Sequence, residues 1–162
     1  MVVDVTETPI ERPQKKQKWA YSGKKKQHTL KCQIIIERDT LEIICLHFGL
    51  GRTHDFSLFK VAGIHMHPDT GMIGDSGYQG IARYLANSYI PKKKPKNGEL
   101  SEAERDDNRI LSKERICIEH VNRRVKIFRI LGQRYRNRRK RYGLRFNIIA
   151  ALYNYELSLV YE

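Results

Sequence analysis

Three acidic residues, far apart in the chain, have the chemistry needed to hold divalent metal ions. Asp4 lies in the β-branched run VVDVTE, Asp75 ends the apolar run MIGD just before a Ser-Gly-Tyr turn, and Glu119 lies within RICIEHVNRRVK. Carboxylate oxygens are the ligands that hard cations such as Mg²⁺ prefer. Taken singly, each acid is better explained as a turn, strand-end or surface residue. A metal site therefore requires folding to bring the three segments together.

Polar residues on both sides of Glu119 repeat with helical spacing. Arg115, Glu119, Asn122 and Lys126 follow at intervals of four, three and four, so they share one face of a helix. Basic groups placed before and after the acid would contact DNA phosphate or orient the carboxylate. The alternative is a solvated row of ion pairs, each worth ~0.3 kcal/mol.

The segments that must position these acids indicate a mixed sheet. Five of them are apolar or β-branched, as expected of strands: 2–7, 29–37, 41–49, 72–75 and 89–91. The lysine-rich stretch between the first two strands predicts a basic hairpin with its turn at Ser22-Gly23.

Helices are expected to alternate with the later strands and then to dominate. Short helices are predicted from His54 or Asp55 to Gly63 and over 78–88. One long helix is predicted from Ser101, with Gly132 ending or bending it, because Leu111, Ile118, Val121, Val125 and Phe128 form one apolar face. An apolar closing helix is predicted over 146–161. This order predicts a single α/β domain whose sheet is covered by helices on both faces.

Charge points to a polyanionic partner. The 162 residues carry 31 Lys and Arg against 18 Asp and Glu, a formal charge of +13, which favours nucleic acid. Residues 123–145 concentrate basic side chains, and runs at 24–26 and 92–94 add to them. No run reaches the ~20 apolar residues of a membrane span. Residues 1–20 lack signal-peptide features, so an intracellular location in the cytoplasm or nucleoid, with no membrane contact, is expected.

The cysteines suggest no chemical role. Cys32, Cys45 and Cys117 are odd in number, widely spaced and surrounded by apolar residues. This pattern favours reduced thiols in the core over a disulfide set or a zinc site.

Several motifs together resemble one known family. VVDVTETPIERP, GRTHDFSLFK, GDSGYQG and RICIEHVNRRVKIFR occur in this order, followed by RYRNRRKRYGLRFNIIAALYN. They resemble the catalytic domain of a DDE transposase of insertion-sequence family five, from about Asp4 to the C-terminus. The resemblance implies an RNase H-like fold, with a mixed five-stranded sheet, flanking helices and a basic C-terminal helical extension. It implies that Asp4, Asp75 and Glu119 are catalytic and bind two Mg²⁺ ions, with Mn²⁺ as a substitute.

The family's signature around its last acid is matched in part. It reads Tyr, two residues, Arg, three residues, Glu, six residues, Lys; Arg115, Glu119 and Lys126 match, whereas Ser112 occupies the tyrosine position. The departure leaves the metal ligands in place and removes any role that the tyrosine has.

The implied reaction is hydrolytic cleavage at transposon ends, followed by transfer of the 3′ hydroxyl into target DNA. Two alternatives stay open: a truncated, non-catalytic DNA-binding remnant or regulator, and a structure-specific nuclease on the same fold. The expected partners are double-stranded DNA, as ends and target, and either a second copy or a separate recognition chain. Residues 1–162 are expected to form the catalytic domain without an N-terminal DNA-recognition region. The residues expected to contact DNA are Arg115, Asn122, Arg123, Lys126, Arg129, Arg136, Arg138, Arg139, Lys140 and Arg141.

Overall fold

Three long antiparallel strands form the centre of the sheet. The computed structural model describes residues 1–160. β3 (Gln27–Ile36) pairs with β1 (Val2–Pro9) on one side and with β4 (Ile43–Leu50) on the other. β3 is buried from Thr29 to Ile36, as expected of a strand covered on both faces, although Thr29, Lys31 and Gln33 within it are polar.

Two short parallel strands extend the sheet beyond β1. β5 (Met72–Ile73) pairs in parallel with β1, and β6 (Ser88–Tyr89) pairs in parallel with β5. β2 (Tyr21–Ser22) pairs antiparallel with the start of β3. The order is β2-β3-β1-β5-β6, with β4 also paired to β3. The predicted mixed sheet is thus confirmed, with β2 as an additional short strand.

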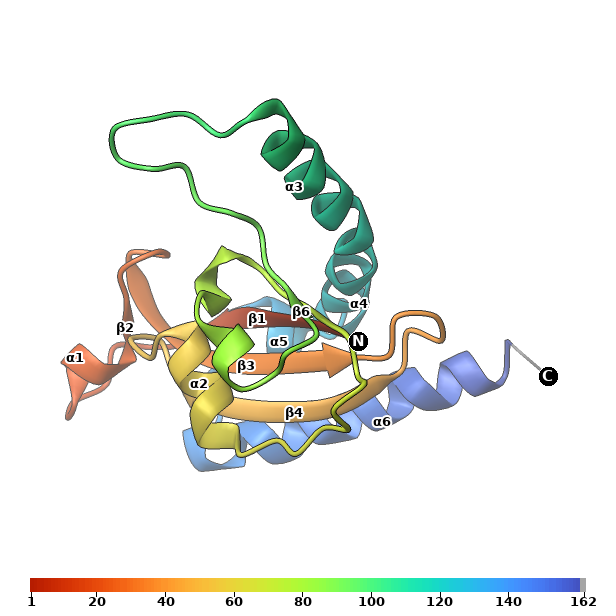
Figure 1. Cartoon of the computed structure of the whole chain (residues 1–162). Coiled ribbons are helices and arrows are strands. Elements are labelled where there is room, and N and C mark those ends of the chain that lie inside the picture. The colour runs from red at the N-terminus through yellow and green to blue at the C-terminus, as the bar shows by residue number, and fades with distance from the viewer. Residues whose placement is uncertain (161–162) are drawn as a thin grey trace.

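Helices cover both faces of the sheet, as predicted (Figure 1). Alternate residues of β1 and β3 point to opposite sides. On one side Val3 and Ile35 pack with Phe59 of α2 (Asp55–Ala62). On the other side α4 (Ile116–Lys126), α5 (Arg129–Gly132) and α6 (Tyr142–Ser158) pack against Val2 and Ile34.

The remaining elements lie outside these layers. α1 (Gln17–Ala20) precedes β2, and α3 (Glu102–Glu114) extends away from the sheet with no buried residue (Figure 1). α3 begins at Ser101, whose side chain accepts from the Glu104 amide while the Glu104 side chain accepts from the Ser101 amide. This reciprocal cap fixes the helix start that was predicted.

The single long helix predicted from Ser101 to an end or bend at Gly132 is wrong, because the chain breaks into α3, α4 and α5. α3 and α4 meet at Arg115, and Phe128 has a non-helical backbone with φ −66° and ψ 109°. The second break lets α5 fold back on α4. A Cβ at Gly132 would overlap the carbonyl oxygen of Lys126, so only glycine permits this close approach.

The helix predicted over 78–88 is also wrong. The segment holds only single 3₁₀ turns at Ser76–Tyr78 and Ile81–Arg83. Gly80, between them, has a φ of +92°, and a left-handed residue ends one turn before the next begins.

Other predicted boundaries fit better. α2 ends at Gly63 as expected, the basic hairpin is present as β2 and β3, and the closing helix starts earlier than predicted, at Tyr142. The predicted end of that helix at residue 161 lies outside the described residues. Within residues 1–160, no helix combines the length and the apolar character needed to cross a bilayer.

Candidate active site

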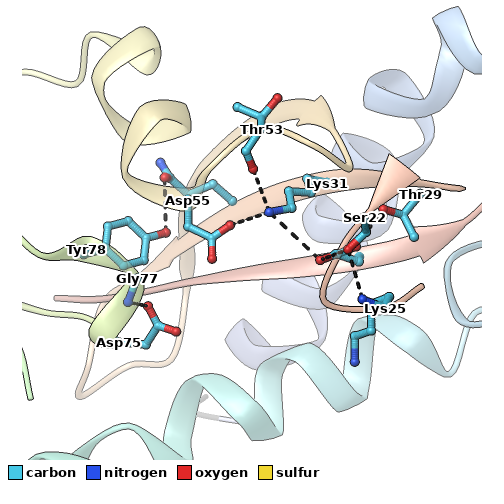
Figure 2. Close-up of polar contacts among 11 residues, drawn as sticks. Ser22, Lys25, Thr29, Lys31, Thr53, Asp55, Asp75, Gly77 and Tyr78 are labelled. Carbon is cyan, nitrogen blue, oxygen red and sulfur yellow. Dashed lines mark hydrogen bonds and ion pairs between the residues drawn. The ribbon is translucent and has the colours of Figure 1, made fainter. Parts of the chain in front are cut away.

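Sheet register brings Asp4 and Asp75 together. Val2 of β1 pairs in parallel with Ile73 of β5, so the acids two residues further on in each segment lie at the same level. The Asp75 carboxylate accepts a hydrogen bond of 2.7 Å from the Gly77 amide (Figure 2). This contact caps the 3₁₀ turn that follows β5 and holds the carboxylate at the end of the strand.

Gly77 separates two carboxylates. A Cβ at this position would lie 2.8 Å from Oδ1 of Asp75 and 3.2 Å from Oδ2 of Asp55. Asp55, the first residue of α2, therefore faces the same small volume as Asp75. Only glycine leaves that volume to the two carboxylates.

Asp4 is partly buried, with its side chain 21% exposed, and its charge is incompletely compensated. The Asn122 amide donates to its Oδ2 at 2.9 Å, and the Arg115 guanidinium lies 3.7 Å from its Oδ1. Burial raises the pKa of Asp4 to about 6; Arg115 opposes this shift, while the charges of Asp75 and Asp55 add to it.

The groups that contact Asp4 are themselves only partly satisfied. Oδ1 of Asn122 and Nε of Arg115 are buried without a hydrogen-bond partner among residues 1–160. Buried polar atoms in folded proteins are rarely left unpaired. Carboxylate and amide oxygens around an under-compensated Asp4 fit the donor preferences of a hard divalent cation. No three His, Cys, Asp or Glu side chains in the described chain are already grouped as ligands would be.

The structure does not place the Glu119 carboxylate with the other two acids. α4 faces Asp4 at the level of Glu119, because Arg115 and Asn122, on either side of it in the helix, both reach Asp4. The Glu119 side chain is exposed. It makes no hydrogen bond or ion pair with any residue in the described part of the chain.

A second charged cluster, which the sequence analysis missed, lies on the opposite face of the sheet. Lys31 Nζ is 2.6 Å from Oδ1 of Asp55, donates to the Thr53 carbonyl at 2.7 Å, and lies 4.0 Å from Glu7 (Figure 2). Lys31 is only 7% exposed. Glu7 also accepts hydrogen bonds from the hydroxyls of Ser22 and Thr29. The available signal was a lysine inside an otherwise apolar strand.

Tyr78 joins this second cluster as a packing residue. Its ring is fully buried, and its hydroxyl donates to Oε1 of Gln33 at 3.2 Å. Burial raises the pKa of Tyr78 far above its usual value, with the nearby Asp55 adding to the shift. The phenol therefore stays protonated and serves as a hydrogen-bond donor.

The segments that build this site lie within the part of the chain that matches known proteins. The chain matches the DDE superfamily endonuclease family over residues 3–154. The chain belongs to this family. It is 53% identical over 159 residues to a protein described as a probable transposase for insertion sequence element IS702 from Microchaete diplosiphon. That alignment covers 98% of the chain and 58% of the relative, so the chain spans little more than half of the relative's length. No solved structure matches.

In this member of the family, the residues predicted to contact DNA fall into two groups. Lys126 is partly buried and donates to the backbone oxygen of Glu7 at 3.3 Å. Burial lowers the pKa of Lys126, and the nearby charge of Lys25 lowers it further. With Arg115 and Asn122, Lys126 forms the inner group. The outer group is exposed on the surface: Arg123, Arg129, Arg136, Arg138, Arg139, Lys140 and Arg141.

Proposed function

We propose that the chain is the catalytic domain of a metal-dependent DNA transposase with an RNase H-like fold. Three antiparallel strands, β4, β3 and β1, followed by the parallel pair β5 and β6, support this assignment of the fold. Membership of the DDE superfamily endonucleases supports nuclease chemistry on DNA.

One observation carries the proposal: Asp4 and Asp75 lie level on neighbouring segments, under the polar face of α4, with Asp4 short of compensating charge. Structural ion pairs are usually better satisfied than this. A buried acid with a raised pKa beside a second acid is a common feature of functional sites.

Asp4, Asp75 and Glu119 are the residues that would hold two Mg²⁺ ions, or Mn²⁺ as a substitute. When bound, such ions activate water and stabilise the departing 3′ oxygen of the DNA strand. Glu119 completes the set from the helix face that already touches Asp4. Arg115 and Asn122 keep Asp4 oriented, and its negative charge is favoured once positive charge is next to it.

The inner basic group would hold the DNA backbone beside the acids. Lys126 and Lys25 lie close enough for their charges to interact, and two neighbouring ammonium groups attract a backbone phosphate, whose negative charge reduces their mutual repulsion. The outer group of arginines and lysines would extend this contact along double-stranded DNA in a salt-sensitive way.

The full reaction in this proposal has two stages on one site. Hydrolysis at each transposon end releases a 3′ hydroxyl, which then attacks a phosphodiester of target DNA; the new bond to phosphorus replaces the bond to the target's own 3′ oxygen, which leaves as a hydroxyl. No protein residue forms a covalent bond to DNA. Holding two ends together requires a second copy of the chain or a complex with a separate recognition chain.

The test is cleavage and joining of DNA carrying the element ends, with a recognition chain supplied and with Mg²⁺ or Mn²⁺ added. Asp75→Asn is expected to abolish nicked and joined products. Asp69→Asn, which changes an exposed acid before β5, is the matched control and should keep both. Undiminished cleavage by Asp75→Asn would overturn the assignment.

A second candidate, a DNA-binding regulator without catalysis, is favoured by the outward position of the Glu119 carboxylate. It predicts salt-dependent DNA binding and no metal-dependent nicking under the same conditions. Nicking without joined donor and target molecules would instead identify a structure-specific nuclease.

A further inference from the structure

The segment 12–28, here called the basic arm, presents aromatic side chains to solvent among cationic ones. It contains α1 and β2 and lies at the end of the sheet away from the C-terminus (Figure 1). Trp19, the single tryptophan of the chain, is 58% exposed, and Tyr21 is 41% exposed. Two large exposed aromatic rings on one short basic segment indicate a surface that binds a ligand.

The rings are held in place by His28 of the arm and by Arg52, which follows β4. The guanidinium of Arg52 lies 5.4 Å from the centre of the Trp19 ring, and the Arg52 amide donates to the Trp19 carbonyl at 3.1 Å. The Tyr21 ring packs edge to face on His28, with centroids 5.5 Å apart. Both aromatic side chains are therefore presented in defined orientations by neighbouring cationic or imidazole groups.

A pocket of about 630 Å³ lies within this arm. Tyr21, His28 and Arg52 line it together with the cationic side chains of Arg12 and Lys18. A flat ring could lie against Tyr21 and Arg52 while an attached anionic group reaches Arg12 or Lys18. A nucleotide has both parts, because its base offers a π face and its phosphate offers negative charge.

The C-terminal basic segment, residues 123–145, offers charge with only one exposed aromatic ring, that of Phe128 at 39%. Tyr135 and Tyr142 within it are each only 2% exposed, and Tyr135 is already stacked against Arg145. Such a surface suits the phosphates of a duplex, whose bases stay inside. The basic arm differs because its exposed rings can stack only on bases that have left a duplex.

The arm is also continuous with the candidate active site. Lys25, in the turn of the arm, is the positive charge that lowers the pKa of Lys126 on α4. Ser22 and Thr29 tie the arm to Glu7 of β1 through hydrogen bonds of 3.2 and 2.6 Å. A strand whose phosphate lies at Lys126 and Lys25 would enter the arm with its next nucleotides.

We propose that the basic arm binds unpaired nucleotides of a DNA strand next to the site of cleavage, stacking a base on Tyr21 and the Trp19–Arg52 pair. The inference rests on the proposed function, in that DNA is taken as the polyanion. It adds a single-stranded segment to the substrate and assigns its recognition to Tyr21, Trp19 and Arg52.

The single tryptophan makes the test direct. Trp19 fluorescence of the full chain is expected to change on saturation with a short oligodeoxythymidine, because the base contacts the only indole. An oligonucleotide of abasic sites with the same length and charge should bind more weakly and leave the fluorescence unchanged. Unchanged fluorescence at saturation with oligodeoxythymidine would overturn the proposal.

Variants separate stacking from charge. Tyr21→Ala is expected to weaken oligodeoxythymidine binding by about 5-fold or more, measured by anisotropy of a labelled strand, with blunt duplex binding unchanged. Trp19→Ala should act in the same direction and Trp19→Phe should retain most of the affinity. Tyr155→Ala, which removes an exposed ring of α6 (62% exposed), is the matched control and should bind like the wild type.

The outcomes distinguish this inference from the proposed function. Tyr21→Ala and Trp19→Ala proteins that fold, by circular dichroism, and bind single strands as tightly as Tyr155→Ala contradict the stacking role alone. Equal losses for single strands and duplex also contradict it. A wild-type chain that binds no duplex and never nicks DNA with metal contradicts the proposed function instead.

Discussion

Both faces of the central sheet carry charged side chains from β1 or β3, but the charges are paired to different extents on the two faces. On the α2 face, Lys31 lies between Asp55, Glu7 and the Thr53 carbonyl, and each charge has a partner. On the α4 face, Asp4 has one distant guanidinium and one amide, and its pKa rises to about 6. The first arrangement pairs its charges within the chain, whereas the second leaves Asp4 under-compensated, and the proposed metal site rests on this difference.

We interpret the paired charges around Lys31 as structural and the under-compensated charge of Asp4 as functional. A buried ion pair with good hydrogen bonds gives the folded state little net energy, but losing one partner is costly. A partly buried acid without full charge compensation lowers the stability of the folded state, and a bound cation would remove this penalty. The predictions below test the contrast in order of expected effect.

Removing the cation of the complete face should have the largest effect. Lys31→Met leaves Asp55 and Glu7 without their shared partner, which is expected to lower the free energy of unfolding by about 3–5 kcal/mol. Chemical denaturation measures the loss. Lys93→Met, an exposed control, should stay within about 0.5 kcal/mol of the wild type. A similar result for both variants would contradict the structural role of Lys31.

Adding a cation to the incomplete face should stabilise the fold. Mg²⁺ at about 100 times its dissociation constant is expected to raise the free energy of unfolding by about 2.7 kcal/mol. Removal of the ion with EDTA should reverse the gain. The gain should disappear in Asp75→Asn and persist in Asp69→Asn; equal gains in both would place the ion elsewhere.

Neutralising Asp4 should also stabilise the metal-free protein. The folded protein binds the Asp4 proton more tightly than the unfolded chain, with a pKa of about 6 instead of 3.8, so stability falls as pH rises through this range. In EDTA, Asp4→Asn should be more stable than the wild type by about 1–3 kcal/mol above pH 6. The difference should fade as pH falls toward 4. A difference that is independent of pH would contradict the burial of this charge.

Removing the positive charge of Arg115 beside Asp4 should have the smallest effect. Arg115→Gln removes the positive charge that opposes the shift, so the pKa of Asp4 should rise above about 6. Carboxyl-carbon NMR titration reports it directly. Arg123→Gln, which changes an exposed arginine of the same helix, should leave it unchanged, and an equal rise would show that the effect is not local.

The strands and α2 could be predicted because their signals are local. The apolar run of β3 and the glycine at the end of α2 each act within a few residues. The break after α4 could not, because Phe128 continues the apolar period and the tight approach of Gly132 to Lys126 exists only in three dimensions. Helix propensity and the period of apolar residues predicted one helix, whereas tertiary packing divides the segment into α3, α4 and α5.

The candidate site was predictable in part for a similar reason. Asp4, Asp75 and Glu119 were identified through motifs, and the register of β1 with β5 then brings the first two together. The inward contacts of Arg115 and Asn122 follow from the helix face that was predicted. The direction of the Glu119 side chain depends on its rotamer, which the sequence pattern does not specify. The pairing of Lys31 with Asp55 joins strand β3 to helix α2, and no short-range pattern encodes such a contact.

The parallel pairing of Val2 with Ile73 has a mechanical consequence. Asp4 and Asp75 lie on segments joined by backbone hydrogen bonds, so the sheet fixes the distance between them. The third acid is carried by a helix joined to the sheet through side chains alone. In the proposed reaction, any adjustment of the three acids to a scissile phosphate would therefore fall on α4, because the sheet fixes the two strands that carry the aspartates.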